Sequence, residues 1–384
     1  MPKAKKKDNK KKNATFFGIT SRVLMLIVAA LLALSYVSIA INPAKVWLVS
    51  LSGLLFVPLM TLNVILLLWA IKRLSKSFVI PLLALIPSFF FIGRYVQIGA
   101  EEEQAGQTKG ETVKVMTWNV GRFAMLDEEA GIRNMQQCAD SVFDYILSQD
   151  PDIVCLQEFK LSGSQKVRDY LSRKMKGYSV EYYMFPSGSG SFGNVTLSRL
   201  PIKDKGRIKF EQSANLAIYT DHQVGDRRFR VYNCHFESYN ISFTGFAKAL
   251  LQRDNTVINE TGTKMKRSIT RRPKQVDQVF SHIEDCPIES FVCGDFNDNP
   301  MSYTYYRMTR HREDSFVEAG KGFGATYALL WPMLRIDYIL YPSRYDAVTN
   351  DIPRVNLSDH YPVMSRRRTS NRRNFIFYRP KNSH

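Results

Sequence analysis

Three long apolar stretches near the start of the chain constrain its fold more than any other feature. The first two, 23–41 and 46–71, contain no charged side chain. Each is long enough to cross the roughly 30 Å of hydrocarbon in a bilayer, which takes about 17–25 residues. The third, 78–98, is also largely apolar but contains Pro81 and Pro87. We therefore expect three transmembrane helices in this part of the chain.

Two alternatives to a membrane anchor follow from the same residues. The basic segment 1–22 resembles the charged start of a signal peptide, but two further apolar runs come directly after the first. Buried helices of a soluble core would keep a polar face, which these runs lack. We interpret 23–98 as an anchor integral to the inner (cytoplasmic) membrane, joined by a linker, 99–111, to the remaining chain.

Basic residues are concentrated at the two ends of the chain. Residues 1–100 carry 13 Lys and Arg against one acid, and 366–384, a predicted basic tail, carry seven basic residues and no acid. The central 101–365 therefore contributes only −1 to the formal charge of +18, which weakens the case for a protein that grips long nucleic acids. The first twelve residues hold seven lysines and predict a cytoplasmic N-terminus. Three spans would then place the following domain in the periplasm.

Between 112 and 365 short β-rich runs alternate with helical segments, and polar residues follow or interrupt the apolar strands. A carboxylate or imidazole in such a place is costly to bury unpaired, so we expect these side chains to meet. Taken singly, Glu158 would be a surface residue and His235 a structural histidine. In chain order the polar segments are Trp118-Asn119, Gln157-Glu158, His235-Phe236, Gly294-Asp295-Phe296-Asn297, Arg335-Ile336-Asp337-Tyr338-Ile339-Leu340 and Ser358-Asp359-His360.

This ordered set of motifs resembles the endonuclease/exonuclease/phosphatase superfamily, which includes deoxyribonuclease I, exonuclease III, inositol polyphosphate 5-phosphatases and bacterial sphingomyelinases. The resemblance covers about 112–365, the whole predicted catalytic domain. It implies an α/β (α+β) four-layer sandwich, in which two mixed β-sheets pack face to face and helices flank them. The site would lie at the strand ends. A fold alone does not name a substrate.

The resemblance also implies a metal site. Glu158 is its principal ligand, and Asn119 and Asp359 complete or orient the shell. Carboxylate and amide oxygens favour Mg²⁺ or Mn²⁺ over Zn²⁺, and the sequence offers no cluster of thiolates. We therefore expect Mg²⁺ (or Mn²⁺) as the cofactor, neutralising charge on a phosphoryl group.

Five further side chains receive catalytic roles from the resemblance. His360 is the general base for the attacking water, and Asp337 orients its ring. Asp295 and Asn297 position the nucleophile and the phosphoryl oxygens, and a locally extended backbone would aim both the same way. His235 contacts a phosphate oxygen or assists the leaving group.

Two functions are compatible with these residues. The first is divalent-metal-dependent hydrolysis of a phosphodiester or phosphomonoester by in-line water attack at the outer face of the membrane. Its substrate would be a lipid headgroup, a small phosphoester or nucleic acid, and a basic segment, 264–272, would be either a surface helix with a solvated loop or a loop that grips the substrate. The alternative is a non-catalytic, membrane-anchored domain that binds a phosphorylated ligand. The predicted partners are the lipid bilayer and the substrate, with no protein partner inferred.

Overall fold

The computed structural model describes residues 2–99, 112–127, 129–162, 166–187, 190–239 and 243–369. The predicted linker lies almost entirely outside the described residues, as does the predicted C-terminal tail beyond residue 369.

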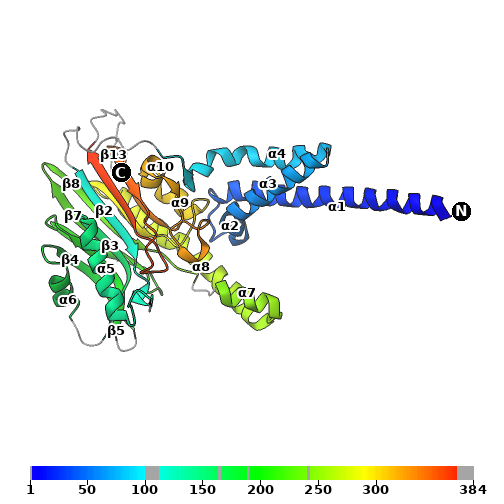
Figure 1. Ribbon diagram of the computed structural model, residues 1–384. Helices are drawn as coiled ribbons and strands as arrows, with labels where there is room; N and C mark the ends of the chain where they lie inside the picture. Colours follow the sequence, from blue (N-terminus) through cyan, green and yellow to red (C-terminus); the bar gives the residue numbers. More distant parts are fainter. Residues whose placement is uncertain are drawn as a thin grey trace.

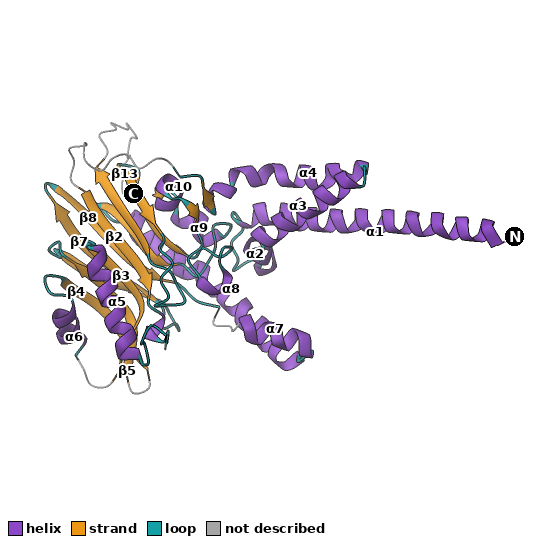
Figure 2. Ribbon diagram, viewed as in Figure 1, coloured by secondary structure: helices purple, strands orange, loops and turns teal. Residues whose placement is uncertain are grey.

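Two six-stranded sheets form the centre of the molecule (Figures 1 and 2). The first has the order β13 (Tyr345–Asp351), β14 (Val363–Thr369), β2 (Thr112–Asn119), β3 (Ile153–Ser162), β5 (Gly190–Ser198), β4 (Ser179–Ser187). The second has the order β10 (Arg312–Asp314), β12 (Asp337–Pro342), β9 (Glu289–Asp295), β8 (Arg227–His235), β7 (Leu216–Val224), β6 (Asp204–Lys209). Both are mixed, because β2 runs parallel to β3 and β8 runs parallel to β9 among antiparallel pairs.

Helices cover the outer face of each sheet. Helices α5 (Met135–Gln149) and α6 (Val167–Lys174) pack on the first sheet, and α8 (Asn255–Glu284) and α9 (Tyr303–Met308) pack on the second. A third apolar cluster fills the space between the sheets. The fold is the predicted four-layer α/β sandwich.

Strand β2 illustrates how the sequence builds these layers. Val113 and Val115 belong to the cluster between the sheets, whereas Met116 and Trp118 belong to the cluster under α5. Successive side chains of a strand point to opposite faces, and both faces of this strand are covered, so its apolar residues do not alternate strictly with polar ones. The site residue Asn119 is therefore found at the strand end.

The N-terminal elements lie together on one side of the sandwich (Figure 1). They are α1 (Pro2–Ser38), α2 (Trp47–Leu54), α3 (Phe56–Lys72), η1 (Lys76–Phe78), α4 (Val79–Leu85), η2 (Ile86–Phe90) and η3 (Ile92–Arg94). In the described chain one helix, Gly18–Ser38, is long and apolar enough to cross a membrane. Helices α2 and α3 are bent by 61° and form a second candidate only if they count as one span.

The prediction of three transmembrane helices is therefore wrong for the described chain. Helix α4 ends at Leu85, and a 3₁₀ segment with Pro87 near its start follows. Proline lacks the N–H that continues an α-helix and clashes with the preceding turn. The remaining apolar helical stretch, Lys76–Phe90, measures about 26 Å at 1.5 Å per residue in α4 and 2.0 Å in the 3₁₀ segments, short of the roughly 30 Å needed.

The other short elements connect these layers. They are β1 (Val96–Gln97), which pairs with β11 (Gly322–Phe323), and α7 (Phe243–Gln252), α10 (Ser315–Ala319), η4 (Gly121–Phe123) and η5 (Ala328–Leu330). The catalytic domain also extends beyond the predicted end at 365. Residues 366–369 belong to β14, where Arg366, Arg367 and Arg368 pair with β2 instead of starting the tail.

Candidate active site

Four predicted site residues lie at strand ends on one edge of the sandwich. His235 ends β8, Asp295 ends β9 and Asp337 begins β12. The strand register places them side by side, because Asp295 is opposite His235 on one side and Asp337 on the other. Asn119 comes from the facing sheet, and its Nδ2 donates a hydrogen bond to Asp295 Oδ2 at 2.9 Å. Both sheets therefore contribute to one polar cluster.

Glu158 reaches this cluster because β3 is irregular at that point. The register with β5 shifts between Leu156 and Phe159, and Glu158 has a φ of 49°. Such irregularities re-aim a side chain, and a left-handed conformation at a non-glycine residue costs about 1–3 kcal/mol. Glu158 Oε1 lies 3.8 Å from His235 Nε2, and Oε2 accepts a hydrogen bond from Arg122 Nε at 2.9 Å.

Arg122 is a residue of this site that the motifs do not reveal. Its half-exposed side chain lies in η4, with the guanidinium 5.2 Å from the centre of the Phe192 ring. Burial raises the pKa of Glu158, but the nearby His235, Arg122 and His360 outweigh burial and hold that pKa below its usual value. Glu158 is therefore an ionised carboxylate, as a metal ligand must be.

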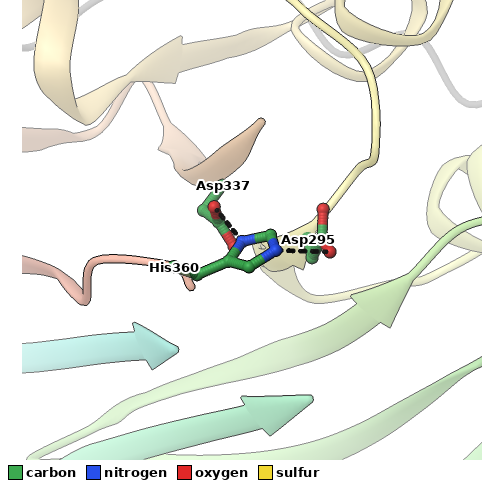
Figure 3. Close-up of side chains that lie close together, drawn as sticks. All are labelled: Asp295, Asp337 and His360. Carbon is green, nitrogen blue, oxygen red and sulfur yellow. Dashed lines mark hydrogen bonds and ion pairs between the residues drawn. The ribbon is translucent and has the colours of Figure 1, made fainter. Parts of the chain in front are cut away.

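His360 and Asp337 form a buried, hydrogen-bonded pair (Figure 3). The distance from His360 Nδ1 to Asp337 Oδ2 is 2.9 Å, and Nε2 faces Asp295 with Oδ2 at 3.9 Å. Burial lowers the pKa of His360, but Asp337 and Asp295 outweigh burial and raise that pKa to about 10. Burial and repulsion by Asp337 raise the pKa of Asp295 to about 6. With this pKa the imidazole is protonated at neutral pH, and the two carboxylates stabilise its positive charge.

The segment that carries His360 is attached to the end of β2. Trp118 Nε1 donates a hydrogen bond to the carbonyl oxygen of His360 at 2.9 Å, and Ser358 Oγ donates to that of Asn119 at 2.7 Å. The Trp118-Asn119 motif and the Ser358-Asp359-His360 motif are therefore in direct contact, although some 240 residues separate them in the chain.

Asn119 and Asp359, the two auxiliary metal ligands predicted, both lie beside Gly121. Asn119 Oδ1 accepts a hydrogen bond from the Gly121 N–H at 3.0 Å. A Cβ at Gly121 would come within 2.7 Å of Asp359 Oδ1, and Gly121 has a φ of 52°. Both atoms of the Asn119 amide have partners, which fixes its orientation. Asp359 is exposed at the rim of the cluster.

Asn297 has a different backbone conformation from the one predicted. The expected extended backbone is wrong, because Asn297 has a φ of 52°. Its N–H donates to Asp295 Oδ1 at 2.8 Å, and its Nδ2 donates to Asp295 Oδ2 at 3.1 Å and to the Phe236 carbonyl at 3.0 Å. Asparagine tolerates left-handed backbone in such turns. Asn297 therefore holds the Asp295 carboxylate in place.

The donor set of this cluster fits a hard divalent cation. One atom each from Asp295, Asp337 and His360 lies within 4.8 Å of the others, and the His360–Asp337 hydrogen bond occupies Nδ1 of the ring and Oδ2 of the carboxylate. His235 Nε2 is buried 3.8 Å from the carboxylates of both Glu158 and Asp295, and among the described residues it has no hydrogen-bond partner. A buried nitrogen without a partner indicates a ligand in this space. The ionised oxygens of Glu158 are what Mg²⁺ or Mn²⁺ prefers.

The basic segment 264–272 lies within helix α8, so the loop that was considered as a substrate grip does not form. Arg272 is buried. Its Nε donates to the Glu237 carbonyl at 2.8 Å and its Nη1 lies 3.1 Å from Asp298 Oδ2. Arg272 therefore links the segment after β8 to the loop after β9.

Gly294 allows β9 to approach β8 closely just before Asp295. It has a φ of 137°, and a Cβ there would be 1.9 Å from the Cys234 carbonyl oxygen. We expect Gly294→Ala to lower the free energy of unfolding by roughly 1–3 kcal/mol, measured by urea denaturation. Gly262→Ala is the control, because its Cβ meets nothing within 4 Å and alanine favours the surrounding helix. Equal unfolding free energies for the two variants would contradict the close approach.

Comparisons with known proteins identify the family and the fold. The model of the Endonuclease/Exonuclease/phosphatase family matches residues 116–360, and that of a domain of unknown function (DUF8431) matches 16–95. The solved endonuclease/exonuclease/phosphatase from Beutenbergia cavernae DSM 12333 is 19% identical with a TM-score of 0.50, covering 67% of this chain and 72% of that chain. At this identity the likeness concerns the fold alone.

Two other solved structures are similar at slightly lower scores. The endonuclease/exonuclease/phosphatase from Bacteroides vulgatus is 17% identical with a TM-score of 0.49, covering 68% of this chain and 100% of that chain. The human Nocturnin catalytic domain with bound sulfate anion is 18% identical with a TM-score of 0.49, and the match covers 67% of this chain and 94% of that chain. The family match includes all six motif segments, in part or whole, and well over half of the 384 residues. The chain belongs to the endonuclease/exonuclease/phosphatase family.

Proposed function

We propose that this protein is a membrane-anchored, divalent-metal-dependent phosphoesterase that hydrolyses a phosphodiester or phosphomonoester by in-line attack of water. Membership of the family supports hydrolysis of a phosphate ester. The observation that carries the proposal is the buried Asp337–His360 pair facing Asp295, beside an ionised Glu158. In this cluster Glu158 would bind the cation, and the side chains that would transfer a proton lie next to it.

Glu158 would be the principal ligand of the cation, with Asn119 and Asp359 next to it. The cation, Mg²⁺ or Mn²⁺, would neutralise charge on the phosphoryl oxygens. His235 faces the same space from between the Glu158 and Asp295 carboxylates, and we assign it to a phosphate oxygen or the leaving group.

His360 is the proposed general base. Asp337 accepts the hydrogen bond from Nδ1, which leaves Nε2 as the ring atom that would take a proton from the attacking water. A ring with a pKa of about 10 is protonated at pH 7, so this role requires a bound cation, whose positive charge would lower the pKa of His360. Asp295 is the second group placed to accept that proton, because its Oδ2 lies 3.9 Å from Nε2 and its pKa is raised to about 6. Asn119 and Asn297 hold this carboxylate with hydrogen bonds to Oδ2.

Turnover of simple phosphate esters tests the proposal. We expect the purified full chain to hydrolyse bis-p-nitrophenyl phosphate or p-nitrophenyl phosphate with Mg²⁺ or Mn²⁺, and to lose this activity in EDTA. The alternative, a non-catalytic domain that binds a phosphorylated ligand, predicts phosphate-ester binding without turnover under every metal condition.

The proposed location is the inner membrane, with the catalytic domain in the periplasm. If the lysine-rich N-terminus is cytoplasmic, one membrane span places the following domain in the periplasm, just as three spans would. Ser38, at the C-terminal end of α1, donates a hydrogen bond to the Met301 carbonyl at 2.8 Å, so the sandwich lies at the end of α1 opposite the lysines. A reporter active only in the periplasm, fused after Glu103, should be active. Activity of a cytoplasm-only reporter at that site would refute this topology.

A further inference from the structure

Helices α7 and α8 form a helical hairpin that extends beyond the sandwich. From Ser268 onward α8 is mostly buried and packs on the second sheet through residues such as Val276 and Phe280. Between 255 and 267 nearly all of its side chains are at least partly exposed. In Figure 1 this half of α8 and α7 project from the same side of the sandwich as the N-terminal helices.

The tip of this hairpin, residues 248–257, presents apolar side chains to its surroundings. Leu251 is 88% exposed, Leu250 52% and Val257 36%. Lys248 and Arg253 stand beside them, also exposed. A group of exposed large apolar side chains marks a surface that contacts something other than water.

The stem of the hairpin touches the anchor. Lys266 in α8 lies with its Nζ 5.7 Å from the centre of the Trp47 ring in α2. Lys264, Lys266 and Arg267 are exposed along the stem, and the hairpin also carries two exposed acids, Glu260 in the stem and Asp254 at the N-cap of α8. Apolar residues at the tip with basic residues above them are typical of helices that lie in the interface of anionic lipid bilayers.

The loop after β9, residues 296–302, contacts the ends of α1 and α2. Asn299, two residues after Asn297, donates from Nδ2 to the Gly53 carbonyl at 2.9 Å. Ser38 donates to the Met301 carbonyl of the same loop. The edge of the sandwich that carries the site is thus held at the level where α1 and α2 meet the domain.

The base of the hairpin contacts the segment that follows His235. Ser268 Oγ donates to the Ser238 carbonyl at 2.7 Å, in the segment that follows His235. The hairpin and the anchor therefore contact the segments that follow the neighbouring strands β8 and β9, and both project from the same side of the sandwich (Figure 2).

We propose that the hairpin tip inserts into the lipid interface beside the anchor, and that these two contacts hold the active site against the bilayer, where it acts on the phosphate of a lipid headgroup. The lipid surface is the occupant that the structure favours, because the tip projects from the same side of the sandwich as the apolar anchor, and its basic stem contacts α2 of that anchor. The choice of substrate rests on the phosphoesterase function and the anchoring proposed above.

The position of the tip is measured with a spin label on Leu251→Cys in the full chain, reconstituted in nanodiscs of phosphatidylcholine and phosphatidylglycerol. Leu147→Cys is the matched control, because Leu147 is an exposed leucine at the end of α5, over the other sheet. Four native cysteines are buried, and the chain without an added cysteine corrects for labelling of Cys286. We expect the label at 251 to collide preferentially with lipid-soluble O₂, and the label at 147 with a water-soluble nickel chelate.

Preference for the nickel chelate at both positions would overturn insertion. A label at 251 shielded from both reagents would also overturn it, since a protein partner would then cover the tip. A chain that does not co-elute with the nanodiscs would refute the anchor itself.

The substrate is tested with Leu250→Glu/Leu251→Glu and the control Leu147→Glu. We expect the double variant to lose about tenfold or more of its turnover of phosphatidylglycerol in these nanodiscs, equivalent to about 1.4 kcal/mol, with hydrolysis of soluble bis-p-nitrophenyl phosphate unchanged. Turnover of the soluble ester but not of the lipid by the unaltered chain would overturn the lipid substrate, as would equal lipid turnover by the double variant. If the unaltered chain hydrolyses neither, the phosphoesterase function fails, and the spin label still decides insertion.

Discussion

Replacing Glu158 with glutamine is expected to lower metal-dependent turnover by roughly a thousandfold, equivalent to about 4 kcal/mol of transition-state stabilisation. The substitution keeps the volume of the side chain but removes the charge that would hold a divalent cation. Its only ion-pair partner of permanent charge among the described residues is Arg122, which is half exposed, so the fold should survive. The measurement is the rate of bis-p-nitrophenyl phosphate hydrolysis across a Mg²⁺ titration, with circular dichroism as the check on folding.

Glu181→Gln is the matched control, because Glu181 forms an ion pair with Lys205 between the edge strands β4 and β6, outside the cluster. This variant should retain the rate of the unaltered chain. A near-normal rate for Glu158→Gln at saturating Mg²⁺ would show that Glu158 does not hold the cation.

Replacing His360, or both Asp337 and His360, is expected to lower the turnover rate by nearly the same factor. General-base assistance typically raises a rate by about 10²–10⁴-fold, so the turnover rate of His360→Ala should be lower by at least about a hundredfold. The turnover rate of Asp337→Asn should decrease somewhat less, because the imidazole remains but loses the carboxylate that accepts the hydrogen bond from its Nδ1. Groups that act as a unit are strongly non-additive, so the double variant should resemble His360→Ala.

The turnover rates of both single variants and the double variant on one phosphodiester test this pairing. Asp226→Asn and His311→Ala are the controls, because both side chains are exposed and lie outside the cluster. If the two single losses simply multiply in the double variant, the residues act independently and the assigned roles have to be abandoned.

The polar cluster at the strand ends could be predicted from the sequence for a physical reason, whereas the two-sheet sandwich followed from the resemblance to a family. An acid such as Asp337 inside an apolar run has to find a partner, and aligned strand ends bring polar groups together. The partner itself, His360, lies 23 residues further along the chain and could be named only through the resemblance to a family.

Other features of the site depend on tertiary structure and leave no pattern in the sequence. Glu158 is aimed by an irregularity in β3, and Arg122 meets it only because η4 follows β2 at the same edge. The left-handed backbone of Asn297 results from its hydrogen bonds to Asp295 and Phe236. None of these contacts follows from spacing along the chain.

The error in the membrane region has a similar origin. Hydropathy favours one span over 78–98 and does not tell whether Pro81 or Pro87 ends the helix, and in the structure α4 ends just before Pro87. The end of this region instead forms a separate two-stranded sheet with β11, where Val96 is opposite Phe323. A strand pair between residues so far apart in the chain cannot be predicted from local composition.

The most direct test of the proposed phosphoesterase is hydrolysis of bis-p-nitrophenyl phosphate by the full chain in water enriched in oxygen-18. Attack of water on phosphorus predicts a labelled oxygen in p-nitrophenyl phosphate, none in p-nitrophenol, and loss of both products in EDTA. Label in p-nitrophenol, or the absence of any metal-dependent turnover, would contradict it.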